Sequence, residues 1–138
     1  MIYHCIRFTV KPEIPEEDRK AALEQMRRHS QAIPSIKSSI AGPDFGGEYD
    51  YGAVTLLEDL ESYEEFMNHP AHGEMDRVGL PLVDEFVSFD ITDDPDPEVG
   101  AKIAEIHRRR FENVPEIADL VAGLYSYTGS AAPGRHET

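Results

Sequence analysis

Two histidines, His69 and His72, lie three residues apart in the segment FMNHPAHGEMD, which covers residues 66–76. Pro70 stands between them in a stretch that otherwise has helical periodicity. Because proline has no N–H to donate and a fixed φ, it is best tolerated as the first residue of a new helix. We therefore expect a helix that begins at Pro70, with His69 as its N-cap and His72 in its first turn.

This position gives His72 a particular proton chemistry. The dipole at a helix start disfavours the imidazolium and favours the neutral ring, which can accept a proton, so His72 is the candidate general base. Two alternatives stay open. Both histidines can be structural, or the pair can bind a metal, since His-x-x-His spacing is compatible with ligation on one helical face. No cysteine or carboxylate at a telling spacing completes such a site, so we expect no metal.

The elements before this segment are predicted from their periodicity. Residues 2–10, IYHCIRFTV, alternate as a strand does and place five side chains on one mainly apolar face: Ile2, His4, Ile6, Phe8 and Val10. Residues 16–31 open with three acidic residues and close with two arginines, the order that a helix dipole favours. Their inner stripe consists of Ala22, Met26, His29 and then Ile33.

Further strands are expected at residues 35–42, 49–58 and 83–92, and Asp59 is expected to cap a short helix. The order is β-α-β-β-α-β, which predicts an α+β, ferredoxin-like fold: a four-stranded antiparallel sheet with both helices on one face. The second face of the sheet carries Tyr3, Cys5 and other sizeable groups. Such a face is costly to leave in water, so we expect a homodimer in which two sheets pack face to face.

A break in composition separates the last part of the chain. The segment DDPDPE covers residues 93–98; residues 1–97 hold 8 basic and 21 acidic side chains, whereas residues 98–138 hold 5 and 6. We expect residues 1–94 to form the domain and residues 95–128 to form two helices that pack on it or on a partner subunit. Residues 129–138 are expected to be disordered. The three arginines at 108–110 are expected to form a solvated helix face.

The overall composition narrows the class of partner. The chain has 138 residues and a net charge of −14, which repels polyanions and argues against nucleic acid and anionic membrane surfaces. The single Cys5 allows no intrachain disulfide and is expected to be buried. No apolar run is long enough to span a membrane, and no signal-peptide pattern opens the sequence. We expect a cytoplasmic protein with a small or neutral partner.

Four segments together resemble the stress-responsive A/B barrel (Dabb) family: YHCIRF, IPSIKSSIAG, EEFMNHPAHGEMD and FVSFDIT. The resemblance covers residues 1–94 and implies a ferredoxin-like fold that dimerises into an α+β barrel. It also implies a possible activity, because the sequence is similar to olivetolic acid cyclase-type enzymes, which close a linear polyketide by aldol condensation without a cofactor.

The resemblance assigns roles to particular residues. The second histidine of the family's HPxH motif, the general base, matches His72, and the histidine of the first strand that lies in the cyclase pocket matches His4. The tyrosine that assists six residues before the base is Phe66 here, which has no hydroxyl to donate. Asp90 matches the FD of the last strand, which can orient a histidine. The expected cavity for a small hydrophobic carbonyl compound has these walls: Ile6, Phe8, Met26, Tyr51, Tyr63 and Phe66.

Three functions compete on this basis. The first is a cofactor-free cyclase or isomerase in which His72 removes a proton beside a carbonyl and His4, Tyr51 or Tyr63 supplies the hydrogen bond that Phe66 lacks. The second is a non-catalytic stress-responsive or small-ligand-binding dimer. The third is a haem-degrading or quinol-oxidising monooxygenase, which shares the dimeric barrel; the absence of tryptophan and of an evident axial-ligand arrangement disfavours it.

Overall fold

The computed structural model describes residues 1–129. Its strands are β1 (Ile2–Val10), β2 (Ile36–Pro43), β3 (Tyr51–Leu57), β4 (Val83–Thr92) and β5 (Ser126–Gly129). Its helices are α1 (Glu16–Gln31), α2 (Leu60–Asn68), α3 (Pro70–Gly79), α4 (Val99–Asn113) and α5 (Pro115–Ala122), with a short 3-10 turn η1 (Leu80–Leu82) before β4. The predicted β-α-β-β-α-β order is confirmed, with the second helical region divided at Pro70.

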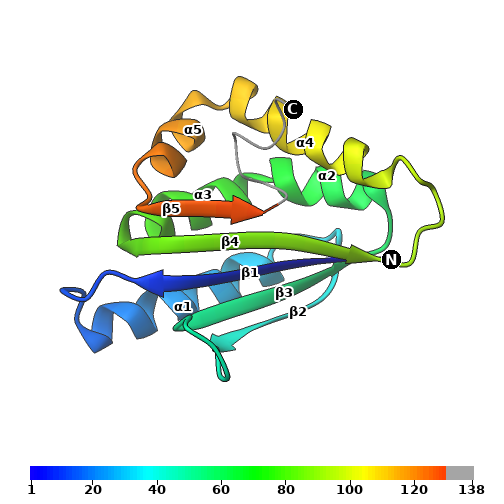
Figure 1. The fold of residues 1–138 in the computed structure, drawn as a ribbon. Helices are drawn as coiled ribbons and strands as arrows, with labels where there is room; N and C mark the ends of the chain where they lie inside the picture. Colours follow the sequence, from blue (N-terminus) through cyan, green and yellow to red (C-terminus); the bar gives the residue numbers. More distant parts are fainter. Residues whose placement is uncertain (130–138) are drawn as a thin grey trace.

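One sheet organises the described residues, with strand order β2-β3-β1-β4-β5 (Figure 1). The central strand β1 pairs antiparallel with β3 and with β4, as a ferredoxin-like α+β fold requires. In the β1–β4 register His4 lies directly opposite Asp90. This pairing brings together two polar side chains that are 86 residues apart in the sequence.

The strand count differs from the sequence prediction. A fifth strand, β5, pairs in parallel with β4 after the helical segment, so the region after residue 95 is more than two helices. Strand β5 is four residues long, too short for an alternating pattern to stand out from the surrounding sequence. Gly129, predicted to begin a disordered tail, is its last residue, and the rest of that predicted tail lies outside the described residues.

The helices lie on one side of the sheet, and α4 and α5 cover the end of that layer where α2 and α3 lie (Figure 1). The main apolar core joins β1 and β3 to α2 and α4 through eight buried side chains: Ile2, Ile33, Leu57, Tyr63, Phe66, Met67, Ile103 and Ile106. Helix α1 has no buried residue of its own. It therefore covers the sheet without filling the space beneath it.

The other face of the sheet carries exposed apolar side chains in adjacent strands. Tyr3 of β1 lies opposite Ile91 of β4, and Cys5 lies opposite Phe89. Ile91 is 59% exposed and Ile40 of β2 is 72% exposed. Cys5 itself is buried, as predicted, and burial raises the pKa of its thiol.

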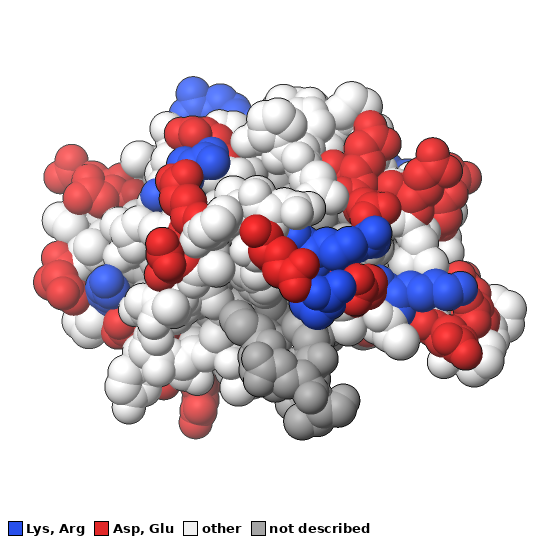
Figure 2. Space-filling view, turned by 90° about the horizontal axis from the view of Figure 1, so that it is seen from above, with Lys and Arg blue, Asp and Glu red and all other residues white. Residues whose placement is uncertain are grey.

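The charges of α4 are paired on the surface, where basic and acidic side chains alternate (Figure 2). Arg108 forms ion pairs with Glu105 and Glu112, and Arg109 with Glu64 of α2. These pairs compensate the positive charges of Arg108 and Arg109 at the surface. Within residues 1–129 no helix combines the length and apolar character needed to cross a membrane.

Candidate active site

The helix joint at Pro70 has the predicted geometry. Pro70 is the first residue of α3, and the Nδ1 atom of His69 accepts a hydrogen bond from the backbone N–H of Ala71 at 3.0 Å. His69 is therefore the N-cap, and that nitrogen is engaged in capping. His72 lies in the first turn of α3 and is buried, whereas His69 is partly exposed.

The surroundings of His72 define its tautomer. Its Nδ1 lies 3.2 Å from the carbonyl oxygen of Met67, which can only accept, so Nδ1 carries the proton in the neutral ring. Nε2 then holds a lone pair, and it lies 3.9 Å from the Asp76 carboxylate, beyond hydrogen-bond distance. The ring of Phe66 stacks on the imidazole with centroids 4.6 Å apart. His72 is thus a neutral acceptor beside an apolar wall.

Burial first and the nearby positive charge of Arg110 second lower the pKa of His72 to about 4, against the opposing effect of Asp76. Arg110 belongs to α4, is buried, and donates to Asp76 at 2.5 Å. The prediction of a solvated arginine face is therefore wrong for Arg110, although Arg108 and Arg109 do lie at the surface. Its ion pair with Asp76 compensates its charge and offsets the cost of burying it.

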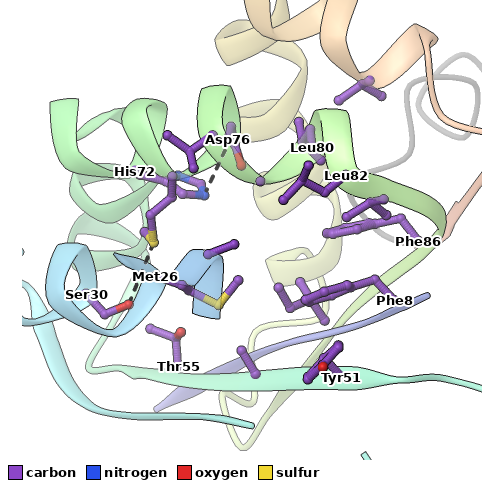
Figure 3. A pocket seen from close by; sticks show the side chains of 18 of the residues that line it. Phe8, Met26, Ser30, Tyr51, Thr55, His72, Asp76, Leu80, Leu82 and Phe86 are labelled. Carbon is purple, nitrogen blue, oxygen red and sulfur yellow. Dashed lines mark hydrogen bonds and ion pairs between the residues drawn. The ribbon is translucent and has the colours of Figure 1, made fainter. Parts of the chain in front are cut away.

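His72 faces a cavity of about 130 Å³ between α1, the sheet and α3 (Figure 3). The cavity lining includes most of the predicted site residues: His4, Ile6, Phe8, Met26, Tyr51, Phe66 and His72. Phe8 stacks between Tyr51 and Phe86, which makes the wall away from His72 aromatic. The space exists because α1 stands over the sheet without burying side chains against it.

Tyr63 occupies a different place from the other predicted wall residues. It is fully buried in α2 and does not line the cavity; its hydroxyl donates to Asp90 at 2.9 Å. Burial first and the charge of Asp90 second raise the pKa of Tyr63 well above its usual range, so the phenol keeps its proton. Tyr63 therefore supports the site from behind.

The same carboxylate holds His4. Nδ1 of His4 lies 2.8 Å from Asp90 Oδ1 and, since a carboxylate only accepts, carries the proton of the neutral ring. The orientation of the ring is thus fixed by a histidine–carboxylate pair. His4 also lines the cavity, so a group that can give or take a proton lies in the same cavity as His72.

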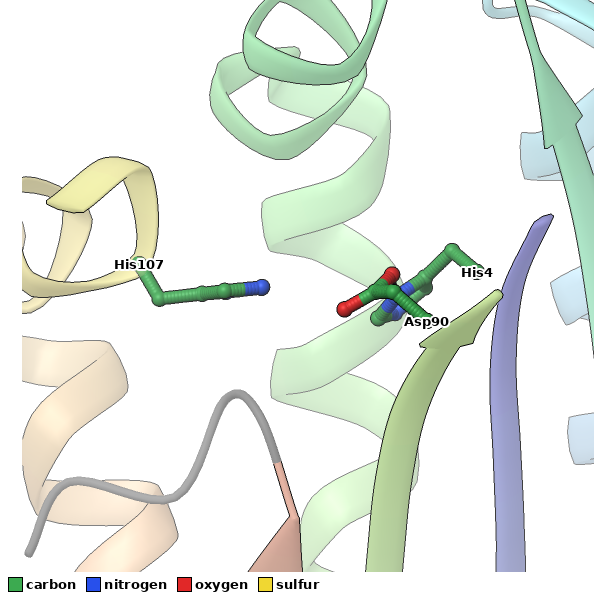
Figure 4. Close-up of side chains that lie close together, drawn as sticks. All are labelled: His4, Asp90 and His107. Carbon is green, nitrogen blue, oxygen red and sulfur yellow. The ribbon is translucent and has the colours of Figure 1, made fainter. Parts of the chain in front are cut away.

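Sequence reasoning missed two buried polar residues of α4. His107 lies 2.7 Å from the Tyr63 hydroxyl through Nε2, and Arg110 reaches Asp76. Both lie on the buried face of α4 with Ile103 and Ile106. The spacing 103, 106, 107 and 110 follows one face of a helix, and it was the signal that these polar residues point inward. The ligand-type atoms of His4, Asp90 and His107 lie within 4.8 Å of one another (Figure 4).

A protein-family model, the stress responsive A/B barrel domain (Dabb), matches residues 2–93. The chain belongs to this family. The match ends near the close of β4, so α4, which supplies His107 and Arg110, lies beyond it. The division of the chain into a domain of residues 1–94 and an extension of residues 95–128 stays a prediction.

Solved structures share the fold of this Dabb protein. A Dabb family protein from Mesorhizobium loti has 22% identity and a TM-score of 0.61, covering 66% of this chain and 94% of that one. Hydroxynitrile lyase from Passiflora edulis has 13% identity and a TM-score of 0.61, covering 67% and 94%. SnoaB, a cofactor-independent oxygenase from Streptomyces nogalater, has 15% identity and a TM-score of 0.55, covering 70% and 97%. A search of curated proteins returned no match.

Proposed function

We propose that this Dabb protein is an enzyme that moves a proton on a small apolar carbonyl compound, as a cyclase or isomerase, with His72 as the general base. The observation that carries the proposal is the state of His72: a buried, neutral ring that lines a mainly apolar cavity, with its unprotonated Nε2 3.9 Å from the Asp76 carboxylate. A base that is neutral at physiological pH is ready to accept a proton, and an apolar cavity strengthens the electrostatic interactions of the transition state.

The proposed reaction uses side chains alone. Nε2 of His72 takes a proton from the carbon next to the carbonyl, and the electron pair of that C–H bond moves toward the oxygen to give an enolate. This oxygen needs a stabilising hydrogen bond, and His4, whose ring is fixed by Asp90 in the same cavity, takes the place of the hydroxyl that Phe66 lacks. In a cyclase the enolate carbon then attacks a second carbonyl of the same molecule, whose C=O π bond opens to an alkoxide that takes the proton back from His72; in an isomerase that proton returns to another carbon.

The cavity limits the substrate. A volume of about 130 Å³ is close to that of an engineered cavity of roughly 150 Å³ that binds benzene. The substrate class we propose is therefore a carbonyl compound about the size of one six-membered ring, with its apolar part against Phe8 and Tyr51. A haem group is much larger than this space, which disfavours the haem monooxygenase alternative.

Ring closure of short diketones tests the proposal. We expect the wild-type protein to convert a diketone whose aldol closure gives a six-membered ring, as followed by chromatography and mass spectrometry. His72→Gln should abolish conversion while the circular dichroism spectrum is retained, and His69→Ala should remain active because His69 only caps the helix. Equal rates for His72→Gln and the wild type would contradict the assignment of the base.

A second candidate function is binding of a small apolar ligand without chemistry. Phe66 favours this binding function, because its phenyl ring stacks on His72 and has no hydroxyl that could donate a hydrogen bond to a reacting oxygen. Under this alternative the diketone binds with measurable heat in calorimetry, but no product forms at any pH. His72→Gln would then weaken binding at most slightly.

We also propose that the protein is a homodimer formed through the open sheet face. The exposed Tyr3, Ile40 and Ile91 make this face costly to leave in water. A related ferredoxin-like protein from Thermobifida fusca, with 21% identity and a TM-score of 0.61, covering 66% of this chain and 89% of that one, is described as dimeric. Sedimentation equilibrium should give twice the chain mass, and Ile91→Asp, which places a charge on this exposed face, should give monomers. A wild-type monomer at micromolar concentration would contradict the dimer.

A further inference from the structure

A cluster of polar side chains lies at one wall of the cavity, where three elements meet. His4 of β1 and Asp90 of β4 are direct partners across the sheet, and His107 reaches them from α4, beyond the segment that the family model matches. His4 and His107 are buried, and the side chain of Asp90 is 5% exposed. Two imidazoles and one carboxylate converge here from parts of the chain as far apart as residues 4 and 107 (Figure 4).

The Tyr63 hydroxyl adds a fourth oxygen to this cluster. It lies 3.1 Å from His4 Nδ1, 2.9 Å from Asp90 Oδ1 and 2.7 Å from His107 Nε2. The three other atoms lie within 4.8 Å of one another, with 2.8 Å between His4 Nδ1 and Asp90 Oδ1. The Tyr63 hydroxyl is therefore hydrogen-bonded to each of the other three side chains, His4, Asp90 and His107.

These separations are close to those of a tetrahedral metal centre. Ligand atoms about 2.0–2.1 Å from a metal are roughly 3.4 Å apart in a tetrahedron. In the cluster the Tyr63 oxygen lies 2.7–3.1 Å from each of the other three atoms, and those three lie within 4.8 Å of one another. An ion at the centre would take the place of the hydrogen-bonding protons, and side-chain shifts on the order of an ångström would bring the four donors to tetrahedral spacing.

We propose that His4, Asp90 and His107, with Tyr63 as the fourth donor, form a binding site for a first-row divalent transition metal such as zinc. The donor set selects the ion, because two imidazole nitrogens with one carboxylate suit zinc, iron and cobalt, whereas calcium and magnesium prefer oxygen donors alone. The net charge of −14 favours uptake of a cation. The site departs from the sequence-based prediction of no metal, which considered only His69 and His72.

The metal site shares His4 with the proposed reaction but does not include the base, His72. An ion bound to Nδ1 of His4 places the proton of the neutral ring on Nε2, the nitrogen for which residues 1–129 supply no hydrogen-bond partner. The ion thereby sets the tautomer of His4, with the metal on Nδ1 and the proton on Nε2. His72 is not a ligand, so loss of the metal and loss of the base are distinct events.

Cobalt titration of the full chain, purified in the presence of a chelator and then dialysed, tests the site. We expect the wild type to take up one Co²⁺ per chain and to develop the visible absorption of a nitrogen- and oxygen-ligated ion. His107→Gln and Asp90→Asn should each weaken uptake roughly 100-fold or more. His29→Gln, which removes a histidine of α1 far from the cluster, and His72→Gln should bind as the wild type does.

Two results would overturn the proposal. One is a wild-type protein that binds no Co²⁺ and no Zn²⁺ at a stoichiometry of one. The other is a folded His107→Gln or Asp90→Asn variant, verified by circular dichroism, that binds the ion as tightly as the wild type does. If His107→Gln does not fold, the test rests on Asp90→Asn, which keeps the shape of the side chain. If neither variant folds, the test rests on the number of ions bound per wild-type chain.

Discussion

Replacing His72 by glutamine should make the protein less sensitive to acid, because His72 is buried in its neutral form. Burial and the charge of Arg110 lower the pKa of His72 to about 4, whereas a histidine in the unfolded chain titrates near 6.5. Between these values the unfolded chain binds a proton that the folded protein does not. The free energy of unfolding therefore falls as the pH falls from about 6.5 to about 4, and the contribution of His72 is fully present only above that range.

The size of the effect follows from the two pKa values. One pKa unit corresponds to about 1.4 kcal/mol, so the whole interval is worth about 3 kcal/mol, of which about 2 kcal/mol is lost between pH 7 and pH 4.5. Urea unfolding at these two values, for the wild type and for His72→Gln, isolates the term, because the other acidic groups are the same in both proteins. The wild type should lose about 2 kcal/mol more than the variant. Equal losses would refute the neutral, buried state of His72.

Three further predictions test neighbouring parts of the site. Arg110→Met should raise the pKa of His72 toward its ordinary value in an NMR titration of the ring, because the substitution removes a positive charge. Arg109→Met, at an exposed position, should leave the pKa of His72 unchanged. Identical titrations for both variants and the wild type would count against this role of Arg110. Tyr63→Phe should lower the free energy of unfolding, measured in urea, by about 1–3 kcal/mol, because Asp90 and His107 each lose a buried hydrogen bond. An unchanged unfolding midpoint would show that these hydrogen bonds do not stabilise the protein. His69→Ala should cost about 1 kcal/mol through loss of the cap of α3, with a cost near zero showing that the cap contributes little.

The elements that have regular periodicity were predictable from the sequence. Alternation over residues 2–10 and 83–92 gave β1 and β4, and the fixed φ of Pro70 gave the start of α3 together with the different roles of His69 and His72. The faces of these elements followed from the same periods, so His4 was correctly expected to lie on the inner side of the sheet.

The partners of the site residues could not be predicted in the same way. Which carboxylate meets His4 depends on the register between β1 and β4, and a shift of one residue would have turned Asp90 away. The spacing along α4 indicates that His107 and Arg110 point inward, but the groups that they meet depend on how α4 packs over α2, which a helical period alone does not specify. Strand β5 was missed because four residues carry too little pattern.

Proton exchange in heavy water tests the role of His72 most directly, because it does not depend on knowing the natural substrate. A small apolar ketone that fits the cavity is incubated with the protein in D₂O, and loss of the signal of its protons next to the carbonyl is followed by NMR. We expect exchange well above the buffer rate for the wild type and for His69→Ala, and exchange at the buffer rate for His72→Gln. Exchange by His72→Gln at the wild-type rate would contradict the role of His72 as the base.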